Sequence, residues 1–289
     1  MKTAYLNNKF IPLDKASISI LDRGLLYGDG LFETMRSYKG VVFLLEKHLR
    51  RLKNSLGNLD IGLRAGPQEI KKIIYSLLGK NKLKDAYLKI IVTRGKANGL
   101  PFESRREKPT FIVYALPYDT RPERVYRKGI KACISKNALN EKSKIAGDKT
   151  LCYLSNVLGR KEAEKQGFDD IIFTNSEGFV SEASSSNIFW FRKNTLFTPP
   201  LRSGCLGGII RSEVMRLAKK TVNLNEKLAG KEALFGAEEI FLTNSLTGIM
   251  PVVKVESLRI GGGRQGPVTK QMTDLLKNRI ADYCNAKKR

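Results

Sequence analysis

Strand-like and helix-like segments occur on both sides of a short polar stretch in this 289-residue chain. In the first half, apolar residues recur at helical spacing over 45–57 and again after Pro67, whereas 31–38, 87–93 and 111–116 have strand character. The second half repeats the mixture, with strands expected at 130–135, 171–173, 187–191, 239–243 and 250–255 and helices at 151–166, 208–220 and after Pro267. Such mixing in both halves predicts two domains of the α/β (α+β) class.

The polar stretch itself is the expected boundary between the domains. Residues 117–124 include Pro117 and Pro122 and carry few apolar side chains, which is typical of a linker. We therefore expect an N-terminal α/β domain over 1–117, a linker over 118–125 and a C-terminal α/β domain over 126–289.

Two local turns are also predicted. Asn7 and Asn8 separate two short apolar pairs and are expected to form the turn of a hairpin. Gly167 follows the apolar-periodic segment 151–166 and is expected to end that helix.

The chain is strongly basic. Its 52 Lys and Arg residues against 28 Asp and Glu give a formal net charge of +24, which suits nucleic acid or another anionic partner. The basic residues are spread along the chain, however, without zinc-finger spacing or an RNA-recognition motif. We therefore favour a basic composition with a site for anionic ligands, and keep a non-enzymatic nucleic-acid-binding protein as a remote alternative. No apolar run approaches the roughly 20 residues of a membrane span, so no membrane partner is expected.

Cysteine and histidine usage limits the chemistry further. The four cysteines are far apart and form no CxxC pair, which indicates reduced thiols. With no apolar leader at the N-terminus, this predicts a cytoplasmic protein. His48 is the only histidine and lies among Lys and Arg residues, so we interpret it as a surface residue of the 45–57 helix. Neither a zinc site nor a histidine-based nucleophile is expected.

Two residues could carry other chemistry. Lys149 follows Gly147-Asp148 directly before an apolar-periodic segment, where a partly buried amine can form a Schiff base with a carbonyl compound. Glu182 stands among small hydroxyl residues before an apolar strand, where a carboxylate can hold a protonated ring nitrogen. Taken singly, a solvated lysine and a polar turn explain these residues equally well.

Two turns offer donors for an anion. Residues 206–211 contain two glycines and lead into a predicted helix, whose free N–H groups suit a phosphate. Residues 243–248 add hydroxyl and amide groups at a strand end. An amine, a carboxylate and two anion-binding turns together match the needs of a pyridoxal 5′-phosphate (PLP) site.

The sequence resembles the fold-type IV (class IV) PLP-dependent aminotransferase family, which includes branched-chain and D-amino-acid aminotransferases and aminodeoxychorismate lyases. The matching blocks run in order over nearly the whole chain, at 22–34, 48–52, 149–158, 178–189, 198–211, 241–252 and 261–269. The resemblance implies a two-domain D-amino-acid aminotransferase-like fold, with the PLP lysine in the C-terminal domain, and a homodimer.

The resemblance also implies roles for individual residues. Lys149 would bind PLP covalently and move the substrate proton, and Glu182 would pair with the pyridine nitrogen. Arg51, in preference to Arg50, would bind the phosphate. The other residues placed at the cofactor are Tyr153, Ile209, Ile210 and Ser245, and those placed at the substrate are Tyr27, Phe32, Leu246 and Thr247.

The subfamily stays open at this point. The Arg-x-His element of D-amino-acid aminotransferases is missing after Gly95, and Lys89 stands where branched-chain enzymes often have an arginine. A lysine is a point charge without the bidentate fork of arginine. The implied function is transfer of an amino group from a branched-chain or similar amino acid to a 2-oxo acid such as 2-oxoglutarate. The alternative is an aminodeoxychorismate lyase, which eliminates pyruvate in folate synthesis.

Overall fold

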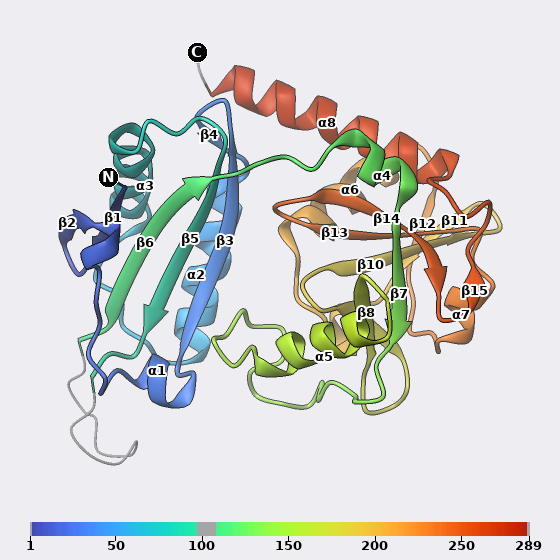
Figure 1. Ribbon diagram of the computed structural model, residues 1–289, viewed down its shortest axis with the longest axis horizontal. Coiled ribbons are helices and arrows are strands. Elements are labelled where there is room, and N and C mark those ends of the chain that lie inside the picture. Colours follow the sequence, from blue (N-terminus) through green and yellow to red (C-terminus); the bar gives the residue numbers. More distant parts are fainter. Residues whose placement is uncertain (1, 97–107, 288–289) are drawn as a thin grey trace. The chain divides into compact units, whose positions relative to one another are not determined.

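The computed structural model describes residues 2–96 and 108–287 (Figure 1). Contacts divide the chain into two compact units. The first comprises Met1–Asp119, Asp148–Tyr153 and Asp282–Arg289, and the second comprises Thr120–Gly147 and Leu154–Ala281. The change of unit after Asp119 falls inside the predicted linker, which also contains the start of a helix at Glu123. Lys149, which we expected in the C-terminal domain, belongs by its contacts to the first unit.

The first unit contains a six-stranded antiparallel sheet in the order β2-β1-β6-β5-β3-β4. Its strands are β1 (Thr3–Leu6), β2 (Lys9–Pro12), β3 (Gly30–Tyr38), β4 (Val41–Val42), β5 (Ala86–Thr93) and β6 (Thr110–Pro117). Its helices are η1 (Leu13–Lys15), α1 (Arg23–Tyr27), α2 (Leu45–Asn58) and α3 (Pro67–Lys80). Both long helices lie where the apolar spacing predicted them.

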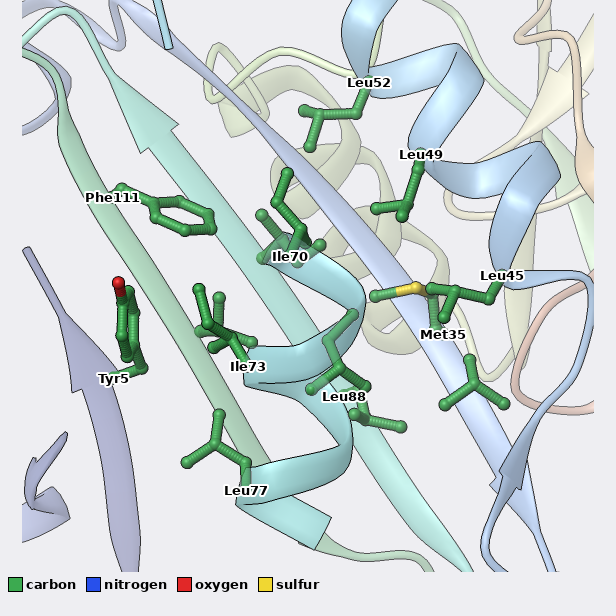
Figure 2. Packing of buried hydrophobic residues seen from close by; sticks show 14 of the residues in the cluster. Tyr5, Met35, Leu45, Leu49, Leu52, Ile70, Ile73, Leu77, Leu88 and Phe111 are labelled. Carbon is green, nitrogen blue, oxygen red and sulfur yellow. The ribbon is translucent and has the colours of Figure 1, made fainter. Parts of the chain in front are cut away.

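The core of the first unit lies between this sheet and helices α2 and α3 (Figure 2). Every third or fourth residue of each helix is apolar, so each helix presents one apolar stripe to the sheet. The packed side chains include Tyr5, Met35, Leu45, Leu49, Leu52, Ile70, Ile73, Leu77, Leu88 and Phe111. Full burial of one such side chain stabilises the fold by about 1.5–3 kcal/mol.

The second unit contains a nine-stranded mixed sheet. Its strands are β7 (Ile130–Ile134), β8 (Asp170–Thr174), β9 (Val180–Ala183), β10 (Asn187–Arg192), β11 (Thr195–Thr198), β12 (Asn223–Glu226), β13 (Glu239–Asn244), β14 (Gly248–Val255) and β15 (Leu258–Arg259). The pairings run β10-β13-β14-β7-β8-β9, and β9 also pairs with β10, so these strands close into a ring. The buried rings of Phe189 and Phe241 stack across β10 and β13, with centroids 5.0 Å apart.

Helices precede, separate and follow these strands along the chain. They are α4 (Glu123–Lys128), α5 (Leu154–Lys165), η2 (Leu201–Ser203), α6 (Ile209–Ala218), α7 (Glu232–Phe235) and α8 (Pro267–Ala286). The last residues of α8 are counted with the first unit. Among the described residues, no helix is both long and apolar enough to cross a membrane.

Helix α5 differs from the helix predicted over 151–166. It begins only at Leu154, because the preceding residues extend along β3 in place of forming a helical turn. Thr150 makes a bridge with Leu31, and the amide of Leu151 donates to the carbonyl oxygen of Gly30 at 2.9 Å. The predicted end is confirmed, since Gly167 has a left-handed φ of 78°.

Candidate active site

The extended segment before α5 places Lys149 against an aromatic pair. The amide of Phe32 donates to the carbonyl oxygen of Lys149 at 2.9 Å. The Nζ atom of Lys149 lies 4.3 Å from the ring centroid of Phe32 and 5.7 Å from that of Tyr153. The two rings meet edge to face, with centroids 5.4 Å apart. The structure therefore brings together three residues that the resemblance placed at the cofactor or substrate.

A buried carboxylate lies next to Phe32 on β3. Glu33 is 1 % exposed, and its two oxygens accept from Arg51 Nε at 2.7 Å and Arg51 Nη2 at 2.8 Å. His48 Nδ1 lies 2.7 Å from the same carboxylate. Burial favours the protonated acid, but the charge of Arg51 and the bond from His48 outweigh it and lower the pKa of Glu33 to about 2. Glu33 is therefore ionised at neutral pH and orients the guanidinium of Arg51.

The interpretation of His48 as a surface residue is wrong. Its side chain is 1 % exposed and lies on the buried face of α2 with Leu45 and Leu49. Burial lowers the pKa of His48, opposed by Glu33 and reinforced by the charges of Arg51 and Lys149. The ring is therefore neutral, and because an ionised Glu33 can only accept, Nδ1 carries the proton. The position of His48 in the apolar spacing of the helix was the signal for its burial.

Lys89 brings a second amine to the Phe32 ring. It lies on β5, is half-buried, and its Nζ atom is 4.5 Å from the ring centroid. Burial lowers the pKa of Lys89. Tyr27, expected at the substrate, is 47 % exposed, and the guanidinium of Arg23 lies 6.0 Å from its ring centroid. Most of the stretch expected to lack the Arg-x-His element, residues 97–101, is outside the described residues.

In the second unit, Glu182 is held by an asparagine and a backbone amide. Glu182 and Asn187 face each other across β9 and β10. The side-chain amide of Asn187 donates to the Leu206 carbonyl at 2.7 Å and lies 3.4 Å from Glu182 Oε2. The amide of Leu206 donates to the same oxygen at 3.0 Å. Asn187 was not among the residues predicted for the site, although a polar residue that opens an apolar strand was a usable signal.

Leu206 lies in the turn that leads into the N-terminus of α6. Gly208 is the N-cap residue and supplies no side-chain cap, so the first N–H groups of the helix have no partner from it. Ile209 and Ile210 open the helix and are 7 % and 3 % exposed. A Cβ atom at Gly208 would lie 1.9 Å from Asn187 Oδ1, so only glycine fits there. The positive end of a ten-residue helix and its amides suit an anion.

The turn between β13 and β14 carries the remaining predicted residues. Asn244 Oδ1 accepts from the amides of Leu246 and Thr247 at 3.0 and 2.8 Å, and from Thr247 Oγ1 at 3.0 Å. A substrate carboxylate at this backbone would therefore share its donors with Asn244. Ser245 lies inside the turn and is partly buried. The neighbouring hydroxyl of Thr243 is buried and has no hydrogen-bond partner among the described residues.

A family model, Amino-transferase class IV, matches residues 30–255. Because this match spans most of the chain, the protein belongs to the class IV aminotransferase family. The predicted mixed fold of this family is confirmed as well, since solved members superimpose on nearly the whole chain.

Curated relatives carry several activities. A Methanocaldococcus jannaschii protein with a provisional branched-chain-amino-acid aminotransferase name is 35% identical over 95% of both chains. The D-alanine aminotransferase of Bacillus licheniformis is 31% identical over 95% of both chains. The aminodeoxychorismate lyase of Bacillus subtilis is 29% identical over 98% of this chain and 96% of its own.

Solved structures similar to this chain include branched-chain amino acid aminotransferases. The branched-chain amino acid aminotransferase of Escherichia coli is 27% identical and superimposes with a TM-score of 0.92 over 96% of this chain and 94% of its own. The T.th. branched-chain amino acid aminotransferase, solved with pyridoxamine 5′-phosphate, is 26% identical, with a TM-score of 0.91 and the same coverage.

Residues in each of the two units suit one part of PLP. The amine of Lys149 suits the aldehyde, and the carboxylate of Glu182 suits a protonated ring nitrogen. The start of α6, which lacks a side-chain cap, suits the phosphate. Within 2–96 and 108–287, no group of three His, Cys, Asp or Glu residues could hold a metal ion.

Proposed function

We propose that this family member is a PLP-dependent amino-acid aminotransferase, which moves an amino group from a branched-chain or similar amino acid to a 2-oxo acid such as 2-oxoglutarate. The observation that carries the proposal is the placement of the Lys149 amine over the Phe32 ring and beside Tyr153. The aminotransferase names of the relatives support the choice of substrate class.

The proposed roles follow from the donors described above. Lys149 would hold PLP covalently through its Nζ atom, and the same amine, when free, would move a proton at the substrate. Arg51, the amides of Ile209 and Ile210, and the hydroxyl of Ser245 bind the phosphate. When bound, PLP supplies an electron sink for the substrate Cα, which Glu182 maintains by pairing with the ring nitrogen. The residues proposed to line the substrate are Tyr27, Phe32, Leu246 and Thr247.

The second candidate is an aminodeoxychorismate lyase. Lys89 favours it, because a lysine replaces the arginine often found in branched-chain enzymes and gives up bidentate carboxylate binding. The Bacillus subtilis relative shows that a lyase occurs among proteins this similar.

The experiment that tests the function compares the two reactions in the PLP-loaded protein. Amino transfer from leucine, glutamate or D-alanine to 2-oxo acids is measured beside pyruvate release from aminodeoxychorismate. We expect amino transfer, with loss of activity to background in Lys149→Ala and no loss in Lys144→Ala, because Lys144 is exposed and has no proposed role. Pyruvate release without amino transfer would make the lyase the correct function.

We further propose a cytosolic homodimer. Large apolar side chains are exposed in each unit, including Ile20 and Leu25 in the first and Leu154 and Leu158 on α5 in the second. A second copy of the chain would cover such surface. Light scattering that gives the mass of one chain would exclude the dimer.

The cytosolic location is supported by the cysteines. None of the four forms a disulfide, which suits a reducing compartment.

A further inference from the structure

Helix α2 carries a stripe of four polar side chains beside its apolar face. His48, Arg51, Ser55 and Asn58 are spaced by three, four and three residues, so they follow one another along one side of the helix. We call these four residues the polar stripe. Its first two members bind Glu33, as described above.

The other half of the polar stripe binds a second carboxylate, that of Asp148. Ser55 Oγ donates to Asp148 Oδ1 at 2.5 Å, and Asn58 Nδ2 lies 3.2 Å from each carboxylate oxygen. Ser55 is 4 % exposed, so its hydroxyl is held inside the first unit. Hydrogen bonds to an ionised acceptor are about twice as strong as neutral ones.

The two bound acids flank the Phe32–Lys149 pair. Glu33 follows Phe32 in the chain, and Asp148 precedes Lys149. The amide of Phe32 donates to the Lys149 carbonyl. The polar stripe therefore binds one residue in β3 and one in the segment that pairs with it and carries the Lys149 amine.

Asp148 is the anchor on the N-terminal side of Lys149. On the C-terminal side, Leu151 is bonded to Gly30 of β3. On the N-terminal side stands Gly147, with a left-handed φ of 81° and no atom within 4 Å of the position that a Cβ would take. Glycine allows many backbone conformations at this point. The bonds from Ser55 and Asn58 to Asp148 therefore restrain the backbone just before Lys149.

We propose that Asp148, held by Ser55 and Asn58, is a positioning residue that fixes the Lys149 amine for its covalent link to the cofactor. The inference rests on the proposed function of Lys149. Nothing about Asp148 requires contact with the cofactor, since it acts through the backbone of its neighbour.

The test compares two ligands of the cofactor-free chain. PLP and pyridoxamine 5′-phosphate share the ring and the phosphate, but only PLP has the aldehyde that reacts with a lysine. In Ser55→Ala and Asp148→Ala we expect PLP affinity to fall about ten-fold and pyridoxamine 5′-phosphate affinity to change less than about two-fold. Ser55→Thr, which keeps the hydroxyl, should restore the ratio. The matched control is Asn54→Ala, an exposed neighbour on α2.

Equal losses for both ligands would show that Asp148 only supports the fold and would overturn the proposal, as would unchanged affinities for both ligands. Asp148→Asn gives a milder variant should Asp148→Ala fail to fold. The Lys149→Ala protein distinguishes a failure of the proposal for Asp148 from a failure of the proposed function. If that protein keeps the full preference for PLP, Lys149 does not form the link, whatever Asp148 does.

Discussion

Glu33 shows how one buried residue organises its neighbours in the first unit. A carboxylate 1 % exposed would be protonated by burial alone, yet Arg51 and His48 keep it ionised. Removing one partner of such a buried pair costs about 3–5 kcal/mol, because the remaining charge is left uncompensated. Arg51 is therefore restrained before any anion reaches it.

The pH dependence of stability should report on His48. Its folded-state pKa lies below the ordinary value of 6.5. As the pH falls below 6.5, the unfolded chain binds a proton at this residue and the folded chain does not, so the free energy of unfolding decreases. Because His48 is the only histidine, His48→Gln should make the free energy of unfolding depend less on pH between about pH 7 and 5. Denaturant unfolding across that range measures it, and an equal slope in the variant would contradict the assignment.

The site was partly predictable at this scale. The resemblance singled out Lys149, Phe32 and Tyr153, and the structure places them in contact. Glu33 escaped notice as a charged centre because its partners lie 15 and 18 residues away. No local pattern records a pairing between a strand and the following helix.

Helices and turns agree with the prediction where residues close in sequence determine them. Asn7 and Asn8 have φ values of 45° and 72°, which suit the tight hairpin turn expected from two asparagines. The apolar period predicted α2 and α3 closely. The start of α5 was wrong because Thr150 pairs with Leu31, more than a hundred residues earlier. The closed ring of strands in the second unit rests on similar distant pairings.

A glycine pair before α6 gives a test at the scale of one element. Alanine at Gly208 would place its Cβ 1.9 Å from Asn187 Oδ1, whereas at Gly207 the nearest atom is Leu201 Cδ2, 3.9 Å away. We expect Gly208→Ala to lower the free energy of unfolding by about 1–3 kcal/mol, because Asn187 and the helix start must move apart. Gly207→Ala should change it by less than about 0.5 kcal/mol. Equal effects in denaturant unfolding would refute the close packing of this turn.

For the molecule as a whole, composition favours anionic ligands but does not identify one. A net charge of +24 produces a field that attracts anions, and both PLP and 2-oxo acids are anionic. The same field would serve many other anions, so the substrate cannot be derived from charge. Under the proposed function, substrate choice depends on the few side chains around Phe32, such as Lys89, whose surroundings only the fold reveals.

The proposed role of Lys149 as the residue that binds PLP has a direct chemical test. The purified chain is incubated with PLP, reduced with borohydride, digested and examined by mass spectrometry. We predict that the phosphopyridoxyl group is found on the peptide containing Lys149 and is absent from the Lys149→Ala protein. Labelling confined to other lysines, or no labelling at all, would contradict this role of Lys149.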